Sequence, residues 1–268
     1  WVRRRISEIN TKKHVASIVA RIRRLGLQHG LSIPARVSLL LRAGLDYDAA
    51  LLAEEEAGRC VREGDKHGAI DLLEQAFAIV EAHEGEVQWD TLLITVVSEL
   101  CRLRINVGRD LTGIPSLLEL ERPVAVRLGD SRTLARIDLV SGLYRYVTGD
   151  SAGGLSLISS GLQKAEELGD EDIMAISAEF RGIYYYLTGL YKEAADAFEL
   201  VMRSGSLQTD KRAPTFLPEH LASSSALGYL CALLGQYHRA VGLLDSHWRR
   251  ARMNKSDRNA CFYEALLG

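Results

Sequence analysis

The string GDSAGG at residues 149–154 is the feature of this sequence that most directly suggests catalysis. It contains the pattern G-x-S-x-G, in which a sharp turn after a buried strand presents a nucleophilic serine, here Ser151. Such a serine attacks an acyl carbon. It needs a histidine and an acid later in the chain, and backbone N–H groups that stabilise the oxyanion. The chemistry would be ester hydrolysis.

The surroundings of Ser151 do not supply these partners. The string resembles the nucleophile elbow of hormone-sensitive-lipase-type esterases, but no His-Gly-Gly string precedes it and no alternation of strands and helices is predicted. Gly149 and Gly154 also occupy regular positions in a helical repeat. We therefore predict that the chain is not an enzyme, and an esterase at this string is kept only as an alternative.

Other patterns for catalysis, metals and cofactors are equally poor. The seven histidines form no H-x₃-H or H-E-x-x-H pair, and no G-x-x-x-x-G-K-[ST] loop is present. The carboxylates of Glu54, Glu55 and Glu56 are consecutive, and consecutive residues of a helix point about 100° apart, which favours a solvated face. We expect no metal and no cofactor.

Cysteine usage and hydropathy predict a soluble, cytoplasmic chain. The four cysteines form no C-x-x-C pair and lie in apolar, helical surroundings, where reduced thiols behave as small hydrophobic groups: Cys60, Cys101, Cys231 and Cys261. The sequence has no uncharged apolar run of about 18 residues, as a membrane span requires. It also shows no signal peptide.

Charge is nearly balanced over the whole chain but unevenly placed. The 268 residues carry a net charge of -2, which argues against a protein that coats nucleic acid. Residues 1–24 hold eight basic and one acidic side chain, whereas residues 46–86 hold twelve acidic and three basic ones. The basic arm could contact nucleic acid or an acidic domain, but a solvated helix that links to an upstream domain is favoured. The basic tail at 239–258 is interpreted as complementing the dipole of its helix.

Part of the chain repeats itself with a period of 40 residues. Residues 128–149, LGDSRTLARIDLVSGLYRYVTG, align with residues 168–189, LGDEDIMAISAEFRGIYYYLTG, and nine of these 22 positions are identical. Repetition at such a period is typical of proteins that stack copies of one supersecondary unit.

Each repeat is marked by a glycine with a small residue seven positions before it and another five positions after it. The glycines are Gly64, Gly108, Gly149, Gly189 and Gly235, the earlier residues are Ala57, Cys101, Gly142, Gly182 and Gly228, and the later residues are Ala69, Gly113, Gly154, Ala194 and Ala240. Glycine adopts the positive φ that ends a helix, and small residues let two antiparallel helices approach closely. Together with helical apolar spacing, the pattern predicts a helix–turn–helix in each repeat.

The repeats divide the chain into a helical cap or linker at 1–44 and a repeat domain at 45–268. The expected units are 46–86, 87–129, 130–169, 170–217 and 218–257, with a sixth that starts at 258. The predicted helix pairs are 46–63 with 66–83, 88–106 with 112–128, 131–148 with 152–168, 171–188 with 191–204, and 218–234 with 237–252. Pro123 is expected to kink or break its helix, because proline has no N–H and clashes with the preceding turn. The stretch 204–217 is expected to be a long connector, and the non-Met start and incomplete sixth unit suggest a segment of a longer array.

This pattern, with a tyrosine two residues after the glycine in GLYKEAADAF (189–198) and GQYHRAVGLL (235–244), resembles the tetratricopeptide repeat. Those repeats usually have 34 residues. The longer unit here, with its recurring LGD, is similar to the repeats of bacterial regulators related to the maltose-operon transcriptional activator. Over residues 46–268 the resemblance implies an all-α fold, a right-handed α-solenoid of about five antiparallel helix pairs, with an effector or protein segment on its concave face. The usual tryptophan of the first helix is missing, and the first three units lack the tyrosine.

The resemblance also suggests which side chains line the concave face. In stacked helix pairs the first helices form this surface, and counting from the turn glycine selects their exposed positions. The candidate binding residues are Arg102, Asn106, Arg136, Leu143, Tyr146, Glu179, Ile183, Tyr186 and Tyr229. Arginine, asparagine and tyrosine among apolar neighbours suit a peptide or small ligand, through bidentate and stacking contacts. The alternative is that several tyrosines only pack between adjacent repeats.

The sequence thus favours a non-catalytic interaction or ligand-sensing module of a bacterial signalling or transcription regulator. Its expected partners are a protein or peptide segment, or a small effector, in the groove, and neighbouring domains of the full-length chain. We expect neither a membrane nor a nucleic acid as a partner. A scaffold that assembles proteins without sensing an effector is the alternative.

Overall fold

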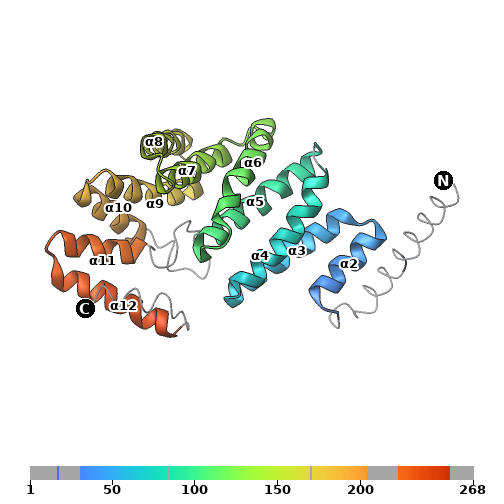
Figure 1. Ribbon diagram of the computed structural model, residues 1–268, viewed down its shortest axis with the longest axis horizontal. Helices are drawn as coiled ribbons and strands as arrows, with labels where there is room; N and C mark the ends of the chain where they lie inside the picture. The colour runs from blue at the N-terminus through green and yellow to red at the C-terminus, as the bar shows by residue number, and fades with distance from the viewer. Residues whose placement is uncertain (1–16, 18–30, 84, 170, 204–222, 254–268) are drawn as a thin grey trace. The chain divides into compact units, whose positions relative to one another are not determined.

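The elements that the structure describes are helices (Figure 1). The computed structural model describes residues 17, 31–83, 85–169, 171–203 and 223–253. Within these ranges it contains eleven α-helices, two short 3-10 helices and no strand, which confirms the all-α prediction.

Most helices follow one another in pairs, with only two or three residues in the turn of each pair. They are α2 (Ile33–Ala43), α3 (Asp46–Glu63), α4 (Lys66–Val80), η2 (Glu81–His83), α5 (Val87–Val107), η3 (Leu111–Gly113), α6 (Ile114–Leu128), α7 (Ser131–Val147), α8 (Ser151–Leu168), α9 (Glu171–Leu187), α10 (Tyr191–Arg203), α11 (Ser223–Leu233) and α12 (Tyr237–Met253). The described helices begin and end close to the predicted bounds.

The five turn glycines all have a positive φ: Gly64, Gly108, Gly149, Gly189 and Gly235. At Gly64, where φ is 88°, the turn lets the N–H of Gly64 donate to the carbonyl of Val61 and the N–H of Asp65 donate to that of Cys60. These bonds satisfy carbonyls that the end of α3 would otherwise leave without a donor. The turn chemistry read from the sequence is confirmed.

The predicted close approach of paired helices is clearest between α7 and α8. A Cβ atom on Gly154 would lie 2.7 Å from the carbonyl oxygen of Gly142, and one on Gly142 would lie 2.7 Å from the carbonyl oxygen of Gly154. These are distances that real Cβ atoms do not tolerate, so the two backbones meet only because both residues lack a side chain.

Contacts along the chain define two compact bodies, and the boundary between them falls within α5. We call residues 1–103 the N-terminal body and residues 104–268 the C-terminal body. In the N-terminal body α3 packs against α2 and α4, and its alanines Ala49, Ala53 and Ala57 are almost completely buried. In the C-terminal body α7 packs against α6, α8 and α9, and α10 lies between α9 and α11. Phe180 and Phe198 are its largest fully buried side chains.

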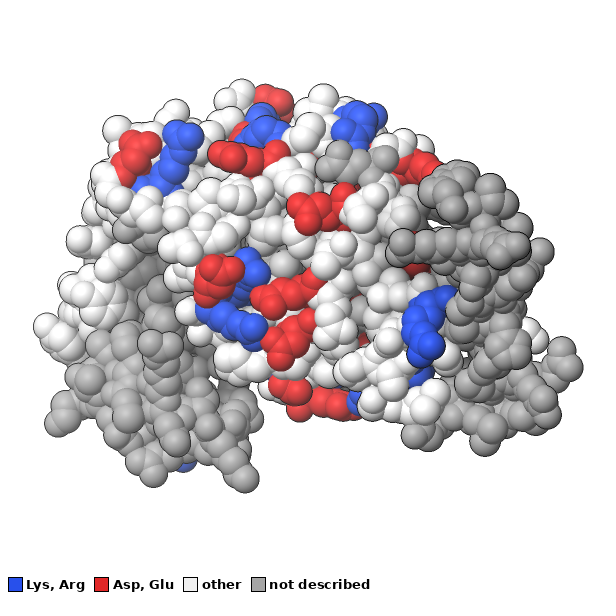
Figure 2. All heavy atoms as spheres, turned by 45° about the vertical axis from the view of Figure 1, so that its right-hand side comes forward, with Lys and Arg blue, Asp and Glu red and all other residues white. Residues whose placement is uncertain are grey.

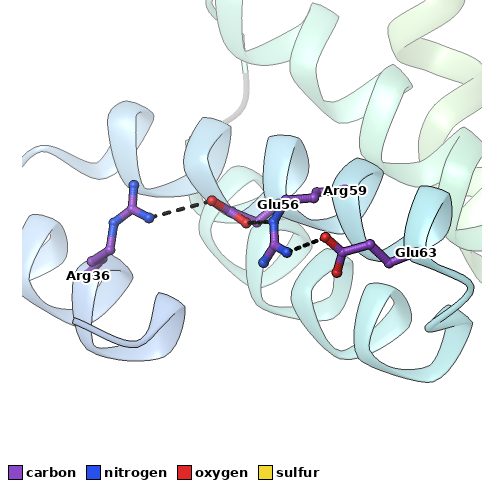
Figure 3. A network of polar contacts seen from close by, with 4 residues as sticks. All are labelled: Arg36, Glu56, Arg59 and Glu63. Atoms are coloured by element: carbon purple, nitrogen blue, oxygen red, sulfur yellow. Dashed lines mark hydrogen bonds and ion pairs between the residues drawn. The ribbon is translucent and has the colours of Figure 1, made fainter. Parts of the chain in front are cut away.

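An ion-pair network in the N-terminal body joins α2 to α3 (Figure 3). The carboxylate of Glu56 pairs with the guanidinium groups of Arg59, with an N–O distance of 2.7 Å, and of Arg36 in α2, at 3.5 Å. The guanidinium of Arg59 also pairs with the carboxylate of Glu63 at 2.6 Å. Thus α2, the described part of the predicted cap, contacts the first repeat through a polar bridge as well as through buried Val37 and Leu40.

An aromatic cluster in the same body joins the starts of α3 and α5. The ring of Trp89 stacks on that of His83, with a distance of 4.2 Å between the ring centroids. It also packs edge to face with the ring of Tyr47, at a centroid distance of 5.1 Å. His83 also lies 3.3 Å from a carboxylate oxygen of Asp46. The cluster gives the first repeat a fixed end where η2 leads into α5.

The prediction of a break at Pro123 is wrong, because α6 continues through it to Leu128. Pro123 cannot donate to the carbonyl four residues earlier, at Glu119. Both residues lie on the exposed side of α6, so water can satisfy that carbonyl. Buried Leu118, Val124 and Ala125 hold the other side of the helix in place.

Several predictions concern residues outside the described ranges. They are the basic arm at 1–24, the connector at 204–217, the start of the fifth pair at 218–222 and the sixth unit from 258. The proposed division into a cap and repeat units remains a prediction.

Candidate binding surface

Four tyrosines from four different helices come together in the C-terminal body. We call Tyr146 of α7, Tyr186 of α9, Tyr191 of α10 and Tyr229 of α11 the tyrosine surface. The ring of Tyr186 lies 5.9 Å from that of Tyr191 and 6.3 Å from that of Tyr229, and the Tyr146 hydroxyl is close enough to act on that of Tyr186. Tyr186 is therefore the centre of the group.

The repeat explains this convergence. Tyr146 and Tyr186 each precede a turn glycine by three residues, so they occupy equivalent places on the first helices of successive repeats. Tyr191 comes two residues after Gly189, and the positive φ of this glycine reverses the chain, so Tyr191 returns beside Tyr186. The ring of Tyr229 comes from the next first helix, α11.

The tyrosine rings are half-buried and keep one side open to solvent. Tyr186, Tyr191 and Tyr229 are 40%, 41% and 38% exposed. Burial raises the pKa of Tyr186, and the hydroxyls of Tyr229 and Tyr191 raise that pKa further. The Tyr186 hydroxyl therefore stays protonated and uncharged at neutral pH, as both a donor and an acceptor of hydrogen bonds.

Exposed leucines lie beside these rings in the sequence. Leu190, between Tyr186 and Tyr191, is 45% exposed, and Leu233, one helical turn after Tyr229, is 48% exposed. On the face that Figure 2 presents, acidic and basic side chains are interspersed among uncharged ones. An aromatic and aliphatic area of this kind is typical of a binding surface.

The structure corrects the expected exposure of Arg136. This side chain is only 7% exposed and forms an ion pair with Glu121 of α6, which is completely buried. The counting rule assumed an open position, but here the second helix of the preceding repeat covers it. Arg136 thus joins α6 to α7 and does not line an open groove.

Glu179 and Ile183 are likewise buried, with exposures of 5% and 7%, because neighbouring helices cover this part of α9. Leu143 and Tyr146 are half-buried. Arg102 lies in the N-terminal body and pairs with Glu99 on the same helix, whereas Asn106 falls in the C-terminal body. Of the nine candidates, Tyr186 and Tyr229 have neighbouring rings, and the hydroxyl of Tyr146 contributes to the raised pKa of Tyr186.

A second polar network joins α7 to the helices before and after it. Asp138, with a side chain 4% exposed, accepts hydrogen bonds from Arg122 of α6 at 2.8 Å and from Lys164 of α8. Burial acts to raise the pKa of Asp138, but these two cations outweigh it and hold the pKa below its ordinary value of 3.8. One carboxylate thus fixes three consecutive helices.

We expect Asp138→Asn to lower the free energy of unfolding at pH 7 by about 1–3 kcal/mol, because it removes two charge-assisted hydrogen bonds. The folded pKa lies below the unfolded one, so this contribution is present above about pH 4 and is lost as the pH falls through the folded value. Urea titrations should show a smaller difference between variant and wild type at pH 3 than at pH 7. Asp245→Asn, on the exposed pair with Arg249, should change little at either pH. A difference independent of pH would contradict the assignment.

The GDSAGG string forms the turn from α7 to α8. Gly149 has a φ of 108°, the Asp150 side chain accepts a hydrogen bond from the N–H of Gly153 at 3.0 Å, and Gly154 meets Gly142. Asp150 is thus the N-cap of α8, and Ser151 is its first residue. The two glycines of the catalytic pattern thus have structural roles, since Gly149 forms the turn and Gly153 donates its N–H to the N-cap.

Asp150→Ala is expected to lower the free energy of unfolding by about 1 kcal/mol, because the N-cap hydrogen bond is lost. Ser151→Ala is expected to leave both stability and any background hydrolysis of a p-nitrophenyl ester unchanged. Thermal unfolding and a spectrophotometric ester assay measure the two quantities. Hydrolysis that Ser151→Ala abolishes would establish the esterase instead.

Within the described residues, no group of three or more His, Cys, Asp or Glu side chains is placed to hold a metal ion. In the same residues, every helix is too short or too polar to cross a membrane.

Comparison with known proteins rests on structure. No protein-family model matches the sequence, and no curated protein matches it either. Among solved structures, a Rap protein in complex with competence and sporulation factor is similar with a TM-score of 0.57 at 15% identity, over 87% of this chain and 62% of that one. A signal transduction ATPase with numerous domains and a tetratricopeptide repeat sensor, from Pyrococcus horikoshii, is similar with a TM-score of 0.50 at 17% identity. The match covers 86% of this chain and 33% of that one. This chain thus spans less than two thirds of either protein.

The chain has a tetratricopeptide-like helical repeat fold. In this repeat the sequence reasoning overlooked one member of the tyrosine surface, Tyr191. Its signal was available, since a tyrosine two residues after the turn glycine was part of the resemblance. The tyrosine was interpreted only as a mark of the repeat. The count of concave-face positions was applied to the first helix of each pair, whereas Tyr191 begins a second helix.

Proposed function

We propose that the chain is a non-catalytic interaction or ligand-sensing module, which holds a protein segment or a small effector on the tyrosine surface. One observation carries this proposal: four tyrosines from four helices converge with their rings partly open to solvent. Aromatic side chains of this kind supply large contact areas and hydrogen bonds, and they dominate many binding interfaces.

We further propose that the module belongs to a cytoplasmic bacterial regulator of signalling or transcription. The resemblance of its repeats to those of such regulators supports this context. The Rap protein was solved with a bound factor, and the Pyrococcus horikoshii protein carries its repeats as a sensor, so both similar structures combine this fold with recognition. In this view occupancy of the tyrosine surface is transmitted to a neighbouring domain.

Substitution of Tyr186 tests the proposed surface. Any peptide or metabolite that raises the melting temperature of the wild type should bind Tyr186→Ala at least tenfold more weakly, because the central ring and hydroxyl are lost. Tyr237→Ala is the matched control, since Tyr237 follows its turn glycine as Tyr191 does and is 69% exposed outside the tyrosine surface. Calorimetric titration measures the affinities, and circular dichroism checks that both variants fold. Equal binding by wild type and Tyr186→Ala would contradict the proposal.

A pure assembly scaffold is the second candidate function, and the same fold favours it. The two functions differ in what stabilises the native chain. A sensor gains several degrees of melting temperature from a small metabolite, whereas a scaffold gains them only from protein segments.

A further inference from the structure

The chemistry of the tyrosine surface indicates which partners it accepts. It offers aromatic rings and phenol hydroxyls, with aliphatic neighbours at Leu190 and Leu233. After burial, the hydroxyls of Tyr229, Tyr191 and Tyr146 contribute to the raised pKa of Tyr186. A partner with its own charges would give up hydration there without gaining a counter-charge from these four side chains.

We propose that the tyrosine surface binds an extended, proline-containing segment of a partner protein in the polyproline II conformation. This inference rests on the proposed function and specifies its ligand. The observation behind it is the juxtaposition of Tyr191, Tyr186 and Tyr229, whose half-exposed rings and hydroxyls come from three helices.

Ring spacing fits such a segment. Neighbouring ring centroids lie 5.9 and 6.3 Å apart, and a polyproline II helix rises about 3.1 Å per residue, or roughly two residues per ring. A segment of about five residues is long enough to lie across the three rings. The rings are tilted relative to one another, by 45° and 71°, so a pyrrolidine ring can pack on the exposed face of one ring and the edge of the next.

Hydrogen-bonding capacity fits as well. A polyproline II segment makes no internal hydrogen bonds, and proline has no N–H, so the segment presents carbonyl acceptors that require donors. Protonated phenol hydroxyls supply such donors without charge. The rings of Tyr186 and Tyr229 lie edge to face, and this packing restricts both side chains before a partner arrives.

Conformational entropy favours this ligand on a small surface. Ordering a flexible segment costs binding free energy, and proline removes much of that cost because its φ is already fixed. A surface made of a few rings therefore holds a preorganised proline segment better than a flexible segment of equal length.

The test uses two blocked peptides of equal length, acetyl-decaproline amide and acetyl-(Gly-Ser)₅ amide, titrated into the whole chain by calorimetry. We expect decaproline to bind at least tenfold more tightly. Tyr186→Phe keeps the ring and removes the hydroxyl, so it should weaken decaproline binding about three- to tenfold, as expected for one hydrogen bond. Tyr186→Ala should weaken it more than tenfold, and Tyr237→Phe should leave it unchanged. Circular dichroism establishes that each variant is folded.

Other results would overturn the inference in distinct ways. If decaproline binds no more tightly than the Gly-Ser peptide, the tyrosine surface does not select proline. Full affinity in both Tyr186→Phe and Tyr186→Ala would place proline binding elsewhere on the chain. If a charged peptide or a metabolite binds instead and Tyr186→Ala abolishes its binding, this inference is wrong but the proposed function stands. If Tyr186→Ala affects no ligand that the wild type binds, both are wrong.

Discussion

Glu121→Ala is expected to lower the free energy of unfolding by about 3–5 kcal/mol, because it leaves the guanidinium of Arg136 buried without its counter-charge. The Glu121 side chain is completely buried and that of Arg136 is 7% exposed. Little water can therefore reach the cation after the substitution. Urea denaturation followed by circular dichroism measures the change.

Two further variants separate this effect from general damage to α6. The double variant Glu121→Leu, Arg136→Met replaces both charges with apolar groups of similar size, and it should recover most of the lost stability. Glu166→Ala removes an exposed partner of Arg181, at 2.7 Å, and should cost less than about 1 kcal/mol. If the double variant is as unstable as Glu121→Ala, packing at α6 and not the buried charge is responsible.

Gly154→Ala is expected to destabilise the C-terminal body by about 2–3 kcal/mol, since the added methyl group overpacks the contact between α7 and α8. The new Cβ would lie 2.7 Å from both the carbonyl oxygen of Gly142 and the backbone nitrogen of Tyr146. Backbone atoms cannot rotate away as a flexible side chain can, so the helices must separate. Because Tyr146 belongs to the tyrosine surface, decaproline binding should weaken as well.

Gly242→Ala is the matched control, because Gly242 lies inside α12 with no atom within 4 Å of an added Cβ. The same substitution there should stabilise the chain by about 0.5–1 kcal/mol through helix propensity. Thermal unfolding of the two variants compares them directly. A Gly154→Ala chain as stable as the wild type would show that α7 and α8 can move apart freely.

Local chemistry made most of the fold predictable. The turn glycines, the small residues on each side of them and the helical apolar spacing led to the helix bounds, since each acts within one repeat. Pro123 was the exception. Whether a proline breaks a helix depends on which side of the helix its lost hydrogen bond faces, and packing decides that.

The candidate site was predictable only in part. Tyr146, Tyr186 and Tyr229 were selected by counting from the turn glycine, and the structure places them together. The same count also selected Arg136, Glu179 and Ile183, which are buried. Counting locates a residue on its own helix, but adjacent helices determine whether that position is covered.

The all-helical repeat, its turns and the two glycines at the contact of α7 with α8 could be predicted from the sequence, because these features depend on residues close together in the chain. The pairing of Glu121 with Arg136 and the place of Tyr191 beside Tyr186 became visible only in the folded chain. These are contacts between side chains of different helices, and their distances and burial depend on how the helices pack. The fold was therefore set mainly by local interactions, and the candidate site by packing.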